Sequence, residues 1–183
     1  MVSEKLPTKK EALQLLIENG CSKNVINHTK AVTKLALEIA KRCEQKGLKV
    51  DTNSVELGAL LHDIGRSKTH SVHHAVVGAE IAKSSRLPEQ IVAIIERHVG
   101  GGITKEEAKE LGWPPKDYLP QTLEEKIVCY ADKLVEGVRR IPAEVTIRKL
   151  TNDLGTNHPS IERVRKLHEE FVFILGDVKC RSK

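Results

Sequence analysis

The sequence predicts an all-α protein, a helical bundle that forms a single domain over residues 1–183. Capping residues begin most of the expected helices, glycines end them, and apolar side chains recur between them at helical spacing. No segment alternates convincingly between apolar and polar residues with the period of two that is typical of a strand. A chain of this length suits one domain, with a core at about residues 20–140 and a C-terminal helical extension at residues 141–183.

Helix-start signals place the elements in order along the chain. A threonine followed three residues later by glutamate forms a capping box at Thr8, Thr104 and Thr122. Asn53 is expected to start the third helix, and Gly65 is expected to end it. The segment Gly100–Gly102 is interpreted as a flexible break and residues 179–183 as a frayed basic tail. The predicted helices cover about residues 8–20, 22–47, 53–65, 73–85, 88–98, 104–112, 122–137, 144–150 and 160–175.

Composition limits the classes of function. Aromatic residues make up only 3% of the chain, so the core must be aliphatic. The net charge of +5 favours anionic partners such as phosphates or nucleic acid, although a mixed charged surface is also an ordinary route to solubility. The four cysteines are widely separated and form no CxxC pair, so buried thiols are expected. No secretory or bilayer-spanning segment is apparent, which predicts a cytoplasmic protein with no membrane partner.

Metal-ligand residue types lie on apolar stripes of three predicted helices. His28 shares a stripe with Val32 and Leu35, and Asp132 follows Val128 by four residues. The pair His62-Asp63 comes directly after an apolar run. Each residue has a plainer interpretation alone, such as a hydrogen-bonded core histidine or a surface pair of Asp132 with the next lysine. Together they form a nitrogen and oxygen ligand set suited to a divalent ion, namely Mn, Mg, Fe, Co, Ni or Zn.

These positions resemble the H…HD…D signature of the HD superfamily of metal-dependent phosphohydrolases. Residues 62–65 read HDIG, a variant of that signature, and residues 124–135, EEKIVCYADKLV, are similar to the last metal helix of the family. Residues 95–120, IERHVGGGITKEEAKELGWPPKDYLP, resemble a small archaeal-type HDIG subgroup. The resemblance covers roughly residues 20–140. It implies an all-helical fold around a central metal site, and it does not identify a substrate.

Two further histidines are candidate metal ligands. His98 follows three isoleucines at helical spacing and His74 lies near another apolar stripe, so both are expected to line the pocket. In binuclear members of the superfamily, histidines at similar places bind a second metal. The resemblance therefore leaves one or two metals per chain open. His158 and His168 fall outside this cluster.

The expected reaction is hydrolysis of a phosphate monoester or diester, with nucleotides as the favoured substrate class. A divalent metal makes a bound water more acidic and polarises a phosphoryl oxygen. Asp63 is a candidate general base as well as a ligand. Arg66 and Lys68 are candidate phosphate-binding cations, with ordinary surface charge as the alternative.

Two other functions remain open from the sequence. One is a di-iron oxygenase, which requires both His74 and His98 to ligate iron. The other is a non-catalytic module that binds nucleotides or RNA, favoured by the basic composition and by Arg139-Arg140. Aromatic residues for base stacking are scarce, and no RNA-binding motif is visible. The oligomeric state and the role of residues 100–120 also stay open.

Overall fold

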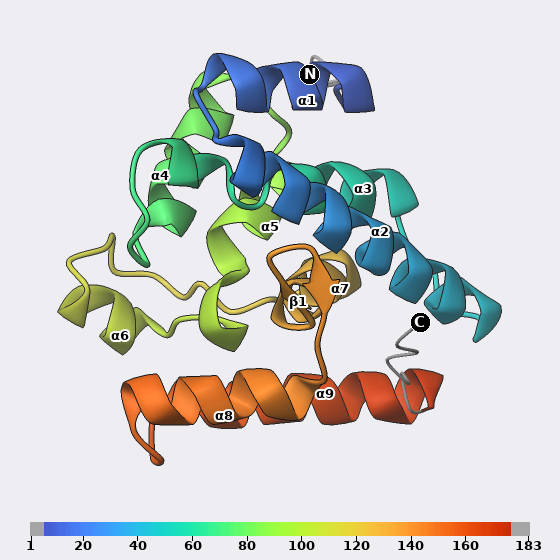
Figure 1. Ribbon diagram of the computed structural model, residues 1–183, viewed down its shortest axis with the longest axis vertical. Coiled ribbons are helices and arrows are strands. Elements are labelled where there is room, and N and C mark those ends of the chain that lie inside the picture. The colour runs from blue at the N-terminus through green and yellow to red at the C-terminus, as the bar shows by residue number, and fades with distance from the viewer. Residues whose placement is uncertain (1–5, 177–183) are drawn as a thin grey trace.

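The structure is a computed structural model that describes residues 6–176, and it confirms the all-α prediction (Figure 1). Short 3-10 helices follow α3 and α5, at Ile64–Ser67 (η1) and Val99–Gly101 (η2). The basic tail predicted at residues 179–183 lies outside the described residues. The α-helices are α1 (Lys9–Glu18), α2 (Lys23–Gln45), α3 (Thr52–Leu61), α4 (His74–Ser84), α5 (Glu89–Arg97), α6 (Lys105–Glu110), α7 (Leu123–Lys133), α8 (Ala143–Leu154) and α9 (Pro159–Leu175).

The helix starts follow the predicted caps, with two differences. Both halves of the capping box form at Thr8 and at Thr104. Thr122 caps α7, but the Glu125 carboxylate accepts from the backbone N–H of Gln121 instead of returning to the cap residue. The start predicted at Asn53 is wrong by two residues, because the Asp51 side chain accepts from the first backbone N–H groups of α3.

A small hairpin replaces the end of the helix predicted to reach residue 137. Helix α7 ends at Lys133, and β1 (Val135–Glu136) pairs antiparallel with β2 (Arg139–Arg140). The expectation that the chain holds no strand is therefore wrong here. Two residues per strand are too few for an alternating pattern to appear in the sequence.

The core is mostly aliphatic, as the composition predicts, and it lies between packed helices that include α2, α3, α5 and α7. Helices α8 and α9 pack against each other across one end of the molecule (Figure 1). An aromatic pair joins this end to the core, because the rings of Tyr130 on α7 and Phe171 on α9 stack with centroids 4.7 Å apart. No helix in the described part of the chain has the length and apolar character needed to cross a membrane.

The three consecutive glycines form a packed turn instead of an open break. All three have positive φ, which glycine adopts without steric cost. A Cβ on Gly101 would lie 3.1 Å from the Arg163 Cβ and from the Val164 nitrogen of α9. The glycines therefore let the start of α9 approach the backbone that directly follows α5.

Candidate metal centre

The side chains of His28, His62, Asp63 and Asp132 meet at the centre of the bundle. His28 comes from the first turns of α2, the His62-Asp63 pair from the end of α3, and Asp132 from the last turn of α7. Oδ1 of Asp132 lies 3.1 Å from Nε2 of His28 and 3.4 Å from Nε2 of His62. Oδ2 of Asp63 lies 3.8 Å from the first of these nitrogens and 3.7 Å from the second. The four residues that the sequence brought together as candidate ligands thus share one site.

The other oxygen of Asp63 faces the second pair of histidines. His74 begins α4 and His98 directly follows α5. Oδ1 of Asp63 lies 3.1 Å from Nε2 of His74 and 3.6 Å from Nε2 of His98. The Asp63 carboxylate therefore stands between two sets of imidazole nitrogens, one set on each oxygen.

Backbone carbonyls orient all four rings. In each imidazole Nδ1 donates to a carbonyl oxygen, and Nε2 is then left with a free lone pair in the neutral ring. The Nε2 atoms of His74 and His98 lie only 3.0 Å apart, so two such lone pairs would repel unless a cation or a proton lay between them. The carbonyl partners are Gly137 for His28 (2.9 Å), Ala59 for His62 (2.7 Å), Ser71 for His74 (2.6 Å) and Ile95 for His98 (2.7 Å).

Two atoms at the centre are buried without a hydrogen-bond partner among the described residues, Nε2 of His62 and Oδ1 of Asp63. Buried polar atoms almost always have a hydrogen-bond partner, because an unpaired one loses its hydrogen bonds to water and gains none in their place. Ligand atoms of one ion, each at roughly 2.0–2.2 Å from it, lie at most about 4.4 Å apart. Two sets of three donors come close to that limit, with all atoms within 4.8 Å of one another: His28, His62 and Asp132, and His62, Asp63 and His98. The residues present fit a divalent metal.

Electrostatics keep His98, Asp63 and Asp132 in ligating form. Burial disfavours the imidazolium and lowers the pKa of His98 to about 4, so this ring is neutral at neutral pH. Burial alone would raise the pKa of Asp63, but the imidazoles of His62, His74 and His98 that face its oxygens hold it well below its usual range. The Asp132 carboxyl also keeps a pKa well below its usual range, because Lys133 and His28 offset its burial.

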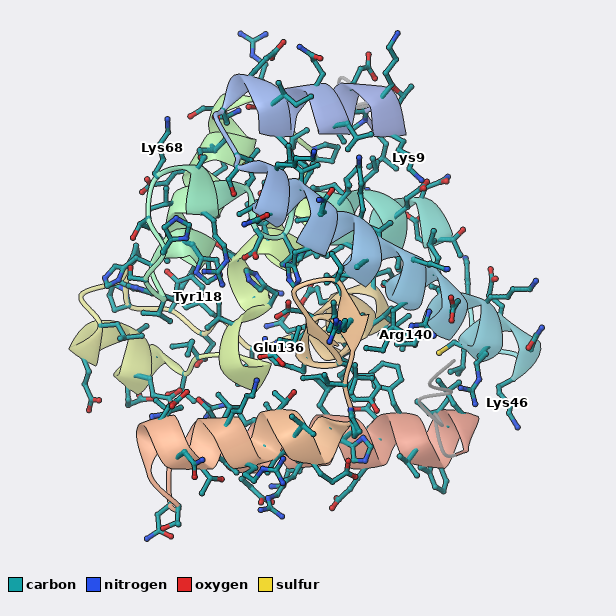
Figure 2. All side chains as sticks on the ribbon, viewed as in Figure 1. Lys9, Lys46, Lys68, Tyr118, Glu136 and Arg140 are labelled. Atoms are coloured by element: carbon teal, nitrogen blue, oxygen red, sulfur yellow. The ribbon has the colours of Figure 1, made fainter. Side chains whose placement is uncertain are left out.

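One of the two predicted phosphate-binding cations reaches the site. Nε of Arg66 donates to Oδ2 of Asp63 at 2.6 Å, and Arg66 lines the cavity beside the centre. Lys68 caps the end of η1, is exposed, and does not line that cavity. Figure 2 shows the Lys68 side chain at the outer edge of the molecule. The structure gives Lys68 no contact with the centre, so the prediction that it binds phosphate there has no support.

Sequence reasoning missed Lys133, which supplies a cation in its place. Its side chain is 12% exposed, its Nζ donates to Oδ2 of Asp132, and it lines the same cavity as Arg66. Burial opposes its charge, but the Asp132 carboxylate raises the pKa of Lys133 above the ordinary value. The interpretation of these two residues as a surface pair is wrong. The signal was present, because a lysine that follows a core-facing aspartate near a helix end lies close to the same site.

A cavity of roughly 480 Å³ opens beside the centre. His74, His98 and Asp132 line it at the metal side, with Arg66 and Lys133. The segment at residues 100–120 lines it through η2 and α6, which gives this insertion a place at the pocket. Its remaining walls come from apolar side chains and from the far end of α8: Val72, Val99, Ile103, Leu111, Leu150, Leu154 and His158.

The chain belongs to the HD domain family, whose model matches residues 25–136. It is 53% identical over 155 residues to "Uncharacterized protein MJ0778" of Methanocaldococcus jannaschii, covering 85% of this chain and 92% of that protein. It is 43% identical over 171 residues to a tRNA (cytidine(56)-2'-O)-methyltransferase of Picrophilus torridus, covering 93% of this chain but 48% of the relative.

More distant relatives include a Ribonuclease Y of Acidothermus cellulolyticus, which is 28% identical and of which the chain covers 31%. The chain thus spans about half, or less, of these longer relatives. Among solved structures, the HD domain of the L. monocytogenes phosphodiesterase PgpH in complex with cyclic-di-AMP matches with a TM-score of 0.52 and 19% identity. That match covers 92% of this chain and 99% of the PgpH domain, and it shows the shared fold.

Proposed function

We propose that this chain is a metal-dependent phosphohydrolase that cleaves a phosphate monoester or diester of a nucleotide. The observation that carries the proposal is the Asp63 carboxylate, held between two sets of imidazole nitrogens at the side of a cavity that also contains two cations. Two divalent ions suit this arrangement better than one, because each oxygen of Asp63 faces its own pair of nitrogens. His28, His62, Asp63 and Asp132 would hold one ion, and His74, His98 and Asp63 the other.

A divalent ion held here would lower the pKa of a water and polarise a phosphoryl oxygen. The chain itself orients the reactants. Asp63 keeps a pKa well below its usual range, so its carboxylate is a weak base. It is better suited to accept a hydrogen bond from an incoming water than to take the proton of that water. Arg66 donates to Oδ2 of Asp63 and Lys133 to Oδ2 of Asp132, and both cations line the cavity where phosphate oxygens would lie.

The names of several relatives support a nucleotide as the substrate. One relative is a tRNA (cytidine(56)-2'-O)-methyltransferase, others are named Ribonuclease Y, and one structural neighbour is a phosphodiesterase in complex with cyclic-di-AMP. All of these names refer to RNA or to a nucleotide. They favour a nucleoside phosphate over a sugar or lipid phosphate for this chain as well.

Removal of the metal tests the proposal directly. Protein stripped with a chelator should lose at least about 100-fold in turnover of nucleoside monophosphates, 2',3'-cyclic nucleotides and dinucleotides. Addition of Mn, Fe, Co, Ni, Zn or Mg should restore it for at least one ion, and metal analysis should find two ions per chain. Full turnover by the stripped protein, or no hydrolysis of any of these esters with any ion, would contradict the proposal.

A substitution of Arg66 should separate phosphate binding from the metal site. We expect Arg66→Met to lower kcat/KM about 10- to 100-fold, because a charged donor to the phosphoryl oxygens is lost. Arg66→Lys should recover most of this loss, since an ammonium keeps the charge without the planar fork. Steady-state kinetics on one substrate decide the point, and metal content should stay the same in both variants. An equal fall in kcat/KM in the two variants would show that the positive charge of Arg66 does not by itself account for its contribution to substrate binding.

The oxygenase alternative has one observation in its favour, the presence of both His74 and His98 at the centre. Oxygen uptake by anaerobically purified, iron-loaded protein would support it. The exposed Arg139-Arg140 pair gives the RNA-binding alternative less support, because Nη2 of Arg140 already binds Glu38. The charged cavity beside the metal ligands favours hydrolysis over either alternative.

A further inference from the structure

Helix α8 carries an apolar face that the described part of the chain leaves partly uncovered. Leu150 and Leu154 are four residues apart and therefore lie on the same side of the helix. Leu154 is 45% exposed and Leu150 is half-buried, while Ala143 is the sole residue of α8 that is fully buried. Both leucines line the cavity beside the metal centre. An amphipathic helix normally buries its apolar side chains, so this face is suited to contact a ligand.

The first half of α8 is fixed to the helix that carries Asp132. The N–H of Ile141 donates to the carbonyl of Leu134 at 2.9 Å, directly before α8 begins. In the first turn of α8 the Thr146 hydroxyl donates to the carbonyl of Lys133. These bonds set the distance between Asp132 and the part of the cavity wall that Leu150 and Leu154 form, called the wall below.

The start of α9, which follows α8 after a short turn, is fixed to the segment that follows His98. His158 caps α9, because its Nδ1 accepts from the N–H of Ser160. In the second turn of α9, Arg163 donates to the carbonyl of Gly102 at 3.0 Å and binds both carboxylate oxygens of Glu107. Helix α8 is therefore held at α7 through its first turn and, through α9, at the segment that follows His98. The match to the HD domain ends at residue 136, so this wall belongs to the part of the chain beyond it.

The remaining surface of the cavity limits what can occupy it. Apolar side chains of Val72, Ile103 and Leu111 also line the cavity, with Arg66 and Lys133 at the metal side. The volume of roughly 480 Å³ lies within the range of small-ligand pockets. The Glu110 carboxylate and Nε2 of His158 belong to the same lining, and an acyl chain has no polar group with which to contact them. A nucleobase has an apolar face and a polar edge, and it suits this mixture better.

We propose that Leu150 and Leu154 determine specificity by contacting the base of a nucleoside phosphate whose phosphate lies at the metal centre. This inference rests on the proposed function, because it takes the phosphate position from the metal ligands and the two cations. It adds that residues beyond the HD match select a substrate with a base over a sugar phosphate without one.

Two inert ligands test the proposal without turnover. The first is the 5'-methylenephosphonate analogue of adenosine monophosphate, and the second is the same analogue of ribose 5-phosphate, which lacks the base. Calorimetry with the manganese-loaded protein should show the first binding at least about tenfold more tightly, the discrimination that apolar pocket contacts typically supply. Leu150→Ser and Leu154→Ser should each reduce this ratio towards one. Leu154→Phe, which keeps an apolar side chain, should retain most of the ratio.

Ile17→Ser is the matched control, because Ile17 is an aliphatic side chain, 58% exposed, at the end of α1 and outside the cavity. This variant should keep the wild-type ratio. Equal binding of the two ligands by the wild-type protein, or an unchanged ratio in both serine variants, would overturn the inference. The hydrolase proposal can fail separately. If the wild-type protein prefers the ligand with the base, the serine variants lose that preference, and no ester is hydrolysed, then the role of Leu150 and Leu154 stands and the proposed reaction is wrong.

Discussion

Asp63→Ala is expected to abolish phosphoester hydrolysis, with kcat/KM falling by at least about 1,000-fold. Asp63 faces both imidazole pairs, so its loss removes a donor from each candidate ion at once. The helical fold should survive. The Arg66 side chain left behind is 30% exposed and can be hydrated, so the substitution leaves no buried, unpaired guanidinium.

Three measurements on the purified variant check this expectation: turnover, metal content and helical circular dichroism. Turnover and bound metal should fall together while the helical signal stays. Asp153→Ala provides the control, because Asp153 is an exposed aspartate of α8 outside the cavity. Retention of metal and activity without the Asp63 carboxylate would remove the basis for the whole assignment.

The side chains that face the core could be predicted from spacing along the chain. His28 and Asp132 stand on the apolar stripes of their helices, and the cost of burying a carboxylate without a partner makes Asp132 conspicuous in the sequence. The same spacing predicts that His98 points inward, and it is buried at the centre. Helical periodicity predicts these positions because it depends only on local geometry, which the chain fixes before any tertiary contact forms.

The cavity walls could not be predicted in this way. Leu150 and Leu154 belong to a helix whose path is set by contacts with the backbone at Lys133 and with α9, and both contacts are tertiary. The sequence places His158 outside the site, yet it lines the same cavity, because the start of α9 packs against η2. Such residues carry no local signal, since the sequence pattern of an amphipathic helix is the same whether its apolar face contacts the core or a ligand.

Gly65 shows a second limit of local patterns. A glycine after an apolar helix is typical of a left-handed helix stop, and the sequence favoured that role. The structure contradicts it: Gly65 lies inside η1 and is absent from the glycines with positive φ. A Cβ at this position would lie 2.0 Å from the carbonyl oxygen of His74 and 2.6 Å from the nitrogen of Gly78. Gly65 is therefore required because the backbone of α4 touches the backbone of η1.

Gly65→Ala is accordingly expected to lower the free energy of unfolding by about 3 kcal/mol or more, since the added methyl meets backbone atoms that cannot rotate away. For a chain of this size that corresponds to a fall in Tm of roughly 6–12 °C. The displaced carbonyl belongs to His74, so the ring that faces Oδ1 of Asp63 should move with it. Metal affinity should therefore fall in the same variant, which thermal unfolding with and without added manganese would reveal.

Gly112→Ala tests whether Gly65 is needed to end a helix or for the close contact between η1 and α4. Gly112 has a φ of +71°, and a Cβ there would meet nothing within 4 Å, so its substitution costs only the left-handed backbone strain of about 1–2 kcal/mol. If Gly65 were needed to end a helix, the two substitutions would be equally costly, and neither would affect the metal. If it is needed for the contact between η1 and α4, Gly65→Ala should cost clearly more and should be the one that weakens metal binding. Equal losses of stability with unchanged metal affinity would show that the close approach to His74 does not hold the centre together.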